Sequence, residues 1–237
     1  MPYLPTTNQY YKFNYSDLEN YFMKMEVFKR RTLQKNYIHR WMEYLEKIDR
    51  VIEEECASNS SPANIYVNLD DEIFPQNVTF DSINIKLHFN ATNIDKFLKD
   101  REVLPISTSL FKYQEGIHFT KTDGKLYKLK GVPTVLLAEF YNNPFIKAYV
   151  VDGSHRLTSA ISNGYSEVNA KIITEKELSH FKQGFATEWD YAFYLFINEM
   201  SIMHRYTTEH GEPEKVMVNN SYLSDGYYKL DFYPYNT

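Results

Sequence analysis

The chain has 237 residues, with 26 lysines and arginines against 31 aspartates and glutamates, so its formal net charge is −5. The hydrophobic share of 43% and the charged share of 24% are ordinary for a soluble globular protein of one or two domains. No apolar run approaches the roughly 18 residues that a membrane helix needs, which excludes an integral membrane protein. The excess of acidic residues argues against a protein whose main function is to bind nucleic-acid phosphates, although it does not exclude a local basic patch.

The N-terminal residues, the single cysteine and the many aromatic residues give further expectations about cellular location and core packing. Residues 1–6 lack the basic and apolar regions of a signal peptide, so we expect a cytoplasmic protein. The single cysteine, Cys56, can form no internal disulfide and no thiolate metal cluster. The 21 tyrosines, 16 phenylalanines and 2 tryptophans are predicted to fill the core rather than to form a base-stacking surface.

The first long block, residues 16–56, carries apolar residues at helical spacing. Ser16 and Glu19 stand at the spacing of a capping box, which predicts the start of a helix there. The polar stretch 29–36 interrupts the apolar stripe, so the pattern predicts two helices or one bent helix. The basic run 29–31 is interpreted as a solvated face rather than a phosphate grip.

Strands and a short helix are predicted after this block. Residues 57–63 are rich in serine, asparagine and proline and predict a loop. The segments 65–69 and 78–89 have strand character, the latter with partial alternation. We expect Thr92 to cap a short helix that ends near Arg101.

The middle of the chain is less regular. Residues 104–119 show no clear period, and 125–129 form a short predicted strand between two glycine turns. Two apolar strands follow, at 135–141 and 145–151, separated by an Asn-Asn-Pro turn.

Regular patterns return after the second of these strands. A short helix is predicted from about 155 to 163, ended by Gly164 as a left-handed residue, and a strand at 168–173 follows it. Residues 174–177 form a second capping box.

The C-terminal part is predicted to hold two helices, separated near Gly184. The second helix, 188–206, is apolar on more than one side and should be well buried. The tail, residues 216–235, is predicted to form a hairpin that turns at 224–226.

The turn between the strand 145–151 and the helix that follows is the chemically informative part. The strand runs into Asp152, and Gly153 allows a sharp turn through which the backbone can approach a ligand closely. A helix N-terminus attracts anions, and Ser154, His155 and Arg156 add donors, with arginine able to bind phosphate through two parallel hydrogen bonds. The alternative is a turn in which Asp152 or Ser154 only caps the helix.

This segment resembles a known family. Residues 149–172 are similar to the central motif of the ParB/sulfiredoxin-like superfamily, which has a hydrophobic strand, Asp-Gly-x-His-Arg, a short alanine-rich helix, a glycine and a valine-led strand. The resemblance extends more loosely over 131–151 and leaves the first 100 residues and the C-terminal helices uncovered. Members of the superfamily bind or hydrolyse nucleotides at this turn. The resemblance therefore implies that Gly153, Ser154, His155 and Arg156 contact phosphates.

Departures from the family pattern narrow the choice of relative. Sulfiredoxins need a reactive cysteine where this chain has Ser154, which argues against repair of cysteine sulfinic acid. Chromosome-partitioning ParB proteins carry Glu-Arg where this chain has Ser154 and His155, and their DNA-binding helices have no counterpart here. Free-serine kinases, which keep a Gly-x-His-Arg-like turn and use a carboxylate base, agree best with this acidic chain.

A kinase-like mechanism needs phosphates held at the helix terminus, Mg²⁺ to neutralise them, and a carboxylate that takes the proton of the attacking hydroxyl. Asp152 is the leading carboxylate, with orienting Arg156 or capping the helix as its alternative roles. Glu139, on the preceding strand, is a weaker candidate. His155 is expected to donate a hydrogen bond or to protonate the leaving oxygen. The other histidines show no metal-ligand spacing, so no protein metal site is predicted, and no Gly-x-x-x-x-Gly-Lys-Ser/Thr phosphate loop is present.

The sequence thus predicts an α/β (α+β mixed) protein. A ParB/sulfiredoxin-like core at 61–175 would follow an N-terminal helical extension at 1–60 and precede C-terminal helices and a hairpin at 176–237. The expected function is phosphoryl transfer from ATP or another nucleoside triphosphate to a small hydroxyl compound, or hydrolysis of that nucleotide. The rival is a non-catalytic module that is switched by nucleotide or associates with DNA. A nuclease is least favoured, because no carboxylate cluster suggests paired metal ions.

Overall fold

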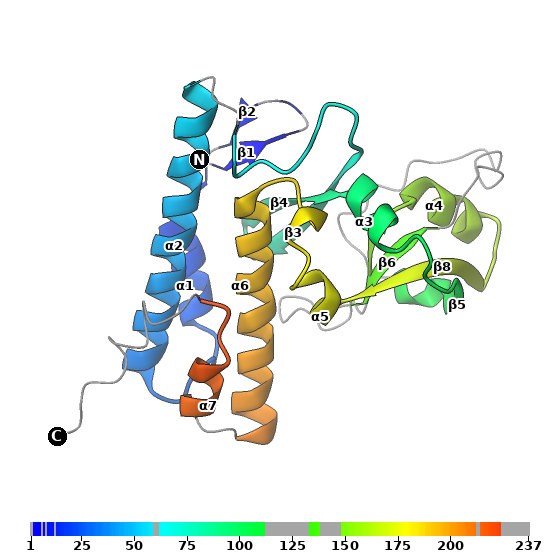
Figure 1. Cartoon of the computed structure of the whole chain (residues 1–237). Helices are drawn as coiled ribbons and strands as arrows, with labels where there is room; N and C mark the ends of the chain where they lie inside the picture. Colours follow the sequence, from blue (N-terminus) through cyan, green and yellow to red (C-terminus); the bar gives the residue numbers. More distant parts are fainter. Residues whose placement is uncertain are drawn as a thin grey trace.

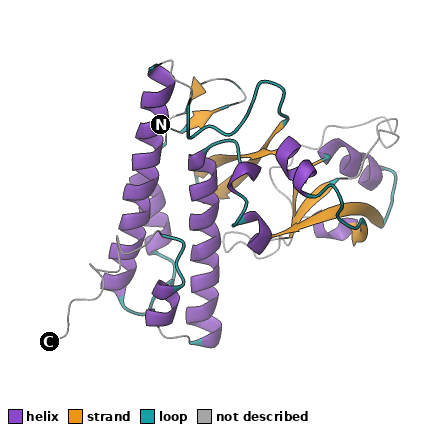
Figure 2. Cartoon of the chain, viewed as in Figure 1, coloured by secondary structure: helices purple, strands orange, loops and turns teal. Residues whose placement is uncertain are grey.

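The computed structural model describes residues 2–5, 7, 9–11, 13–58, 62–111, 133–137, 148–211 and 214–223. It is a mixed α/β structure, as predicted, in which a helical body lies beside a small sheet (Figure 1). Figure 2 shows that one side of the molecule is formed mainly by helices, whereas the other side combines strands with shorter helices. Among the described residues, no helix is both long and apolar enough to cross a membrane.

Two long helices, α2 (Arg31–Ala57) and α6 (Glu188–Arg205), lie side by side in the helical body (Figure 1). The Trp41 ring on α2 packs against the Phe196 ring on α6 with a centroid distance of 5.6 Å. The shorter helices α1 (Tyr15–Met23) and α7 (Glu214–Asn219) complete the body. Helix α6 is buried around most of its circumference, as its apolar sequence predicted.

Two helices are present here, as predicted, but the break between them lies at 24–30 rather than at the polar stretch 29–36, most of which belongs to α2. A buried glutamine holds the break in place. The Gln34 side chain accepts hydrogen bonds from the backbone N–H groups of Val27 and Phe28, at 3.2 Å each, and donates to the Met25 carbonyl at 2.6 Å. The Gln34 amide also donates to the Met23 carbonyl at 3.1 Å, so this one side chain satisfies at least four backbone groups that a continuous helix would have paired internally. The basic residues 29–31 are exposed, in agreement with a solvated face.

The first capping box is wrong. Asn14, not Ser16, caps α1, because the Asn14 side chain accepts a hydrogen bond from the Ser16 N–H at 3.0 Å. The helix therefore begins one residue earlier, at Tyr15, and Ser16 lies within it. Asparagine and serine compete as caps on nearly equal terms, so the spacing to Glu19 alone does not decide between them.

The predicted strand 78–89 is instead a hairpin. Strands β3 (Ile73–Phe80) and β4 (Ile83–Asn90) pair antiparallel, with Phe80 opposite Ile83. The two-residue turn between them uses Asp81 at a φ of 51°, a left-handed conformation that aspartate tolerates better than most residues. The turn carries no glycine, so the sequence looked continuous.

Two neighbouring expectations are also wrong. The segment 65–69 is not a strand, since only Ile65 forms an isolated bridge, to Thr187. Thr92 does not cap the following helix, α3 (Ala91–Phe97), which is capped by the Asn90 side chain and ends before Arg101. The Thr92 hydroxyl instead accepts a hydrogen bond from the Glu72 N–H at 2.8 Å. The Thr92 hydroxyl therefore binds a residue outside the helix instead of capping α3.

The largest sheet among the described residues has four strands in the order β5-β8-β6-β7. These are β5 (Leu104–Ser107), β6 (Thr134–Leu137), β7 (Ala148–Asp152) and β8 (Glu167–Thr174). Strand β8 is antiparallel to β5 and parallel to β6, and β6 is antiparallel to β7. The described parts of both predicted apolar strands are therefore strands, and their remaining residues lie outside the described part of the chain. The predicted strand 125–129 and the predicted turn at 224–226 lie outside it as well. The start of the predicted hairpin is wrong, because residues 216–219 belong to helix α7 (Glu214–Asn219).

Strand β7 of the four-stranded sheet is buried on both faces, whereas β5 and β8 have exposed residues. Helix α4 (Ser154–Ser162) covers one face, where Leu157 and Ala160 pack with Val150 of β7. Alternate residues of β7, Tyr149 and Val151, join the large core of the helical body on the other face. That core contains residues of all three predicted segments, 1–60, 61–175 and 176–237, whose boundaries stay a prediction.

The local signals around α4 are confirmed. Gly164 follows the helix with a φ of +76°, the left-handed conformation expected of it. The second capping box is present as well. The Glu177 N–H donates to the Thr174 hydroxyl at 3.2 Å, and the Glu177 carboxylate accepts from the Thr174 N–H at 2.9 Å.

A buried carboxylate ties the helical body together. Glu199 on α6 is 3% exposed and accepts hydrogen bonds from the Trp41 indole N–H of α2, at 2.9 Å, and from the Tyr222 backbone N–H, at 2.7 Å. Burial raises the pKa of Glu199 to about 7, although these hydrogen bonds and those from Tyr37 and Ser221 act in the opposite direction.

This pKa makes stability depend on pH. The unfolded chain ionises at the ordinary glutamate pKa of 4.5, whereas the folded chain keeps the Glu199 proton up to about pH 7. Unfolding therefore releases a proton between these values, and the free energy of unfolding should fall as pH rises through this window, by on the order of 3 kcal/mol in total.

The comparison with Glu199→Gln isolates this effect, because glutamine does not titrate and all other groups are shared. Urea unfolding at pH 5, 6, 7 and 8 should show the wild type losing stability relative to the variant up to pH 7 and running parallel to it above. Curves that stay parallel over the whole range would contradict a raised pKa at Glu199.

Candidate functional site

The predicted turn is a sharp junction between β7 and α4. Strand β7 ends at Asp152, and Gly153 follows with φ +83° and ψ 28° in the left-handed region. Helix α4 then begins at Ser154, and no side-chain hydrogen bond caps it. Glycine takes this conformation at little cost because it has no Cβ, which explains why the sequence has glycine between strand and helix. The expected geometry of strand, glycine turn and helix N-terminus is therefore present.

Arg156 lies directly over this glycine. A Cβ built on Gly153 would come within 2.6 Å of Arg156 Nη2 and 2.8 Å of both Arg156 Nε and the Pro133 α-carbon. Real Cβ atoms do not make such contacts, so the guanidinium packs against the space that only glycine leaves. The missing side chain serves both the backbone conformation and the placement of the arginine.

Asp152 holds the guanidinium in this place. Arg156 Nη2 donates a hydrogen bond to Asp152 Oδ2 at 2.7 Å, and the two side chains are 19% and 23% exposed. The residues are four apart, and the sharp turn from the end of β7 through Gly153 into the first turn of α4 brings the pair together. Of the roles considered for Asp152, orientation of Arg156 is the one seen in this structure; a role as base stays a prediction.

The other two predicted phosphate contacts differ in exposure. Ser154 is half-buried, and its carbonyl accepts a hydrogen bond from the Thr158 hydroxyl at 2.8 Å, inside α4. His155 is exposed. The buried face of α4, which includes Leu157 and Ala160, anchors both residues to the sheet. Ser154 and His155 thus stand at the start of a firmly packed helix.

Glu139, the second candidate base, lies outside the described residues. Within the described ranges, no group of three or more histidine, cysteine, aspartate or glutamate side chains is arranged to hold a metal ion. Asp152 is therefore the candidate carboxylate whose position at the turn is known.

Sequence reasoning missed a buried polar pair elsewhere in the fold. Asp190 on α6 accepts hydrogen bonds from the His88 N–H at 2.9 Å and from the Thr187 hydroxyl at 2.6 Å. His88 and Asp190 are both almost fully buried. The sequence does contain a signal for Asp190 and Glu199. Both are acidic residues in a helix that is apolar on several sides, so they must be buried and need hydrogen-bond partners there.

Comparisons with protein-family models, curated proteins and solved structures gave no match for this chain. The ParB/sulfiredoxin-like resemblance therefore stays a prediction that rests on residues 149–172.

Proposed function

We propose that this chain binds a nucleoside triphosphate through phosphate contacts at Asp152–Arg156. The observation that carries the proposal is the start of α4 at a left-handed glycine, without a side-chain cap and with the Arg156 guanidinium directly beside it. A helix N-terminus favours negative charge, and a guanidinium matches two phosphate oxygens at once. The sequence resemblance of residues 149–172 implies the same contacts.

The proposed reaction moves the terminal phosphoryl group to a small hydroxyl compound or to water. The attacking oxygen bonds to the terminal phosphorus, the bond from that phosphorus to the bridging oxygen breaks, and the nucleoside diphosphate leaves. The proton of the attacking hydroxyl goes to Asp152, which must first exchange its hydrogen bond with Arg156 for one with the substrate. His155, exposed at the start of the helix, donates a hydrogen bond to the phosphates.

The proposed reaction uses a magnesium ion carried by the nucleotide. Mg²⁺ in such sites binds substrate phosphates and several waters, and its charge would neutralise the phosphates. Asp152 is assigned to the base in this proposal, so the nucleotide's phosphates and water would hold the ion.

A second candidate function is a nucleotide-dependent switch without turnover. The observation that favours it is the hydrogen bond between Arg156 and Asp152 at 2.7 Å, because a carboxylate engaged in this way is not poised to take a proton. In this alternative the phosphates bind at the same turn and are not cleaved.

The binding proposal predicts a thermal shift. A ligand at 100 times its Kd stabilises a protein by about 2.7 kcal/mol, which for a chain of this size raises Tm by about 5–10 °C. We expect this shift with at least one of ATP, CTP and GTP in the presence of Mg²⁺, and its loss in Arg156→Ala.

Arg40→Ala is the matched control. Arg40 also pairs with a carboxylate one helical turn away, Glu43, at 2.7 Å, and it lies on α2 outside the turn. This variant should keep the full shift. A shift that persists in Arg156→Ala would remove Arg156 from the site, and no shift with any of the three nucleotides would refute nucleotide binding at the turn.

Product analysis then separates the two candidate functions. Phosphorus NMR of protein incubated with the bound nucleotide shows whether the terminal phosphate is released or transferred. Turnover that is lost in Asp152→Asn while the thermal shift remains would support Asp152 as the base. A bound nucleotide that stays intact would favour the switch.

A further inference from the structure

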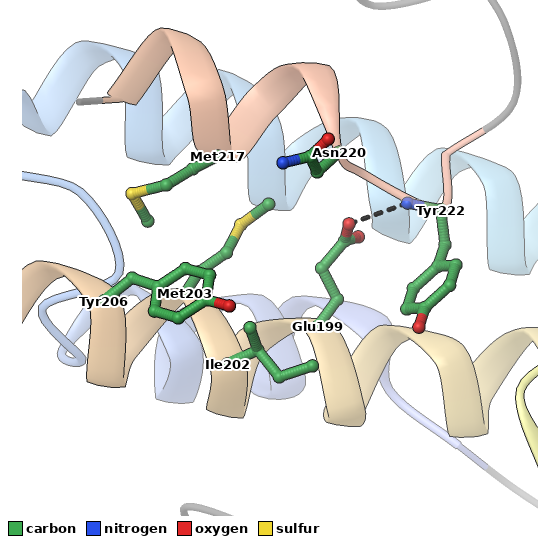
Figure 3. Close-up of a pocket in the computed structure, with 7 residues that line it drawn as sticks. All are labelled: Glu199, Ile202, Met203, Tyr206, Met217, Asn220 and Tyr222. Carbon is green, nitrogen blue, oxygen red and sulfur yellow. Dashed lines mark hydrogen bonds between the residues drawn. The ribbon is translucent and has the colours of Figure 1, made fainter. Parts of the chain in front are cut away.

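A second candidate site lies at the C-terminal end of α6, in the helical body and away from α4 (Figure 1). A cavity of about 190 Å³ opens there between α6 and α7. Figure 3 shows the side chains that line it, which are Glu199, Ile202, Met203, Tyr206, Met217, Asn220 and Tyr222.

The lining is mostly apolar and adaptable. Ile202 and Met203 from α6, with Met217 from α7, provide aliphatic and thioether surface, and Tyr206 adds an aromatic ring. Methionine side chains adjust to irregular ligands and make favourable contacts with aromatic rings. A cavity of about 150 Å³ is enough for benzene, so this one suits a ligand the size of a small ring with a short substituent.

The residues that line the cavity include an acidic side chain and no basic one. Glu199 is the one ionisable carboxylate among the seven lining residues, and none of the seven is cationic. A buried carboxylate without a cation beside it favours a ligand that brings positive charge or hydrogen-bond donors, and it disfavours an anion.

The Glu199 carboxylate is also fixed in position. The Trp41 indole N–H binds one oxygen and the Tyr222 N–H binds the other, the latter bond being drawn in Figure 3. The hydroxyls of Tyr37 and Ser221 also hydrogen-bond to this carboxylate, so its roughly four acceptor positions are filled. These two hydroxyls also hydrogen-bond to each other, so a ligand's ammonium group would take the place of one of them on Glu199. Burial, which raises the pKa of Glu199 to about 7, disfavours its charged form.

The backbone beside the cavity is irregular in a way that recurs at ligand sites. Helix α6 continues into a π-helical turn, Tyr206–His210, and the first residue of that turn lines the cavity. Such wide turns are rare and appear frequently at functional sites.

We propose that this cavity binds a small primary amine with a ring-sized apolar body, its ammonium group on Glu199 and its ring among Met203, Met217 and Tyr206. The proposal is independent of the nucleotide site, because it involves no residue of the Asp152–Arg156 turn.

Isothermal titration with benzylamine, and with benzyl alcohol as its neutral counterpart, tests the proposal. The wild type should bind benzylamine at least tenfold more tightly than benzyl alcohol. At pH 6 binding should release close to one proton, because the ammonium group ionises a Glu199 that is mostly protonated there; the heats in two buffers of different ionisation enthalpy report this release.

Two variants separate the contribution of the Glu199 charge from that of the space in the cavity. Glu199→Gln should lose the tenfold preference and the proton release. Ile202→Trp fills the cavity from a half-buried position without touching the Glu199 hydrogen bonds, and it should abolish binding of both probes. If Glu199→Gln does not fold, the proton release of the wild type and the Ile202→Trp result decide. The proposal would be overturned by any of three results: equal affinity for the two probes, no binding of benzylamine, or undiminished binding in Ile202→Trp.

Discussion

Gly153→Ala should cost about 3 kcal/mol of unfolding free energy and abolish the nucleotide-induced thermal shift. Two penalties add. Alanine at φ +83° is strained, and its Cβ would lie 2.8 Å from the Pro133 α-carbon, a backbone atom that cannot move aside cheaply. The same Cβ would push the Arg156 guanidinium off the turn, since it would lie 2.6 Å from Nη2.

Gly164→Ala is the matched control for this substitution. Gly164 also has a positive φ, +76°, but a Cβ there would meet no atom within 4 Å. This variant should lose only the strain energy, about 1 kcal/mol, and should keep the thermal shift. Urea unfolding of both variants measures the difference. Equal losses in the two variants would contradict the close packing of Arg156 and Pro133 on Gly153.

Asp190→Ala should be similarly or more damaging, with a loss of about 3–5 kcal/mol. The substitution removes the acceptor for the buried His88 N–H and for the Thr187 hydroxyl. Both donors would then remain buried without the partner they have now, and each such group costs about 1–3 kcal/mol. Thermal or urea unfolding of the variant gives the value directly.

An exposed ion pair supplies the comparison for Asp190. Asp95 accepts from Lys171 at 3.1 Å, but its side chain is 65% exposed. Asp95→Ala should therefore change stability by less than 1 kcal/mol. A loss for Asp190→Ala no greater than that for Asp95→Ala would show that the buried pair contributes little to the fold.

Much of the candidate site could be predicted because its interactions are local. Asp152, Gly153 and Arg156 lie within five consecutive residues, and the left-handed glycine, the helix start and the Asp152–Arg156 pair all follow from that short stretch. What the stretch did not indicate is that Arg156 lies against Gly153 and Pro133, because Pro133 comes from a different strand of the sheet. The roles of Asp152 as base and of Glu139 also need partners that the local sequence does not contain.

Errors in the fold arose where two local signals competed. Asn14 and Ser16 were both good caps, and Asn14 caps α1 in the structure. The sequence does not indicate the hairpin at Asp81, because its turn has no glycine or proline. Asparagine and serine differ little as helix caps, so contacts with the rest of the structure easily decide between them.

The sequence by itself determined the features whose partners are close in the chain, namely the capping box at Thr174, the left-handed Gly164 and the strand–turn–helix junction at Gly153. Tertiary structure alone decided the interactions between distant residues. Trp41 meets Glu199 across 158 positions and His88 meets Asp190 across 102. The physical reason is that a hydrogen bond within one turn is specified by adjacent side chains. A buried charge in α6, by contrast, acquires its partners, and Glu199 its raised pKa and its cavity, only when separate elements pack around it.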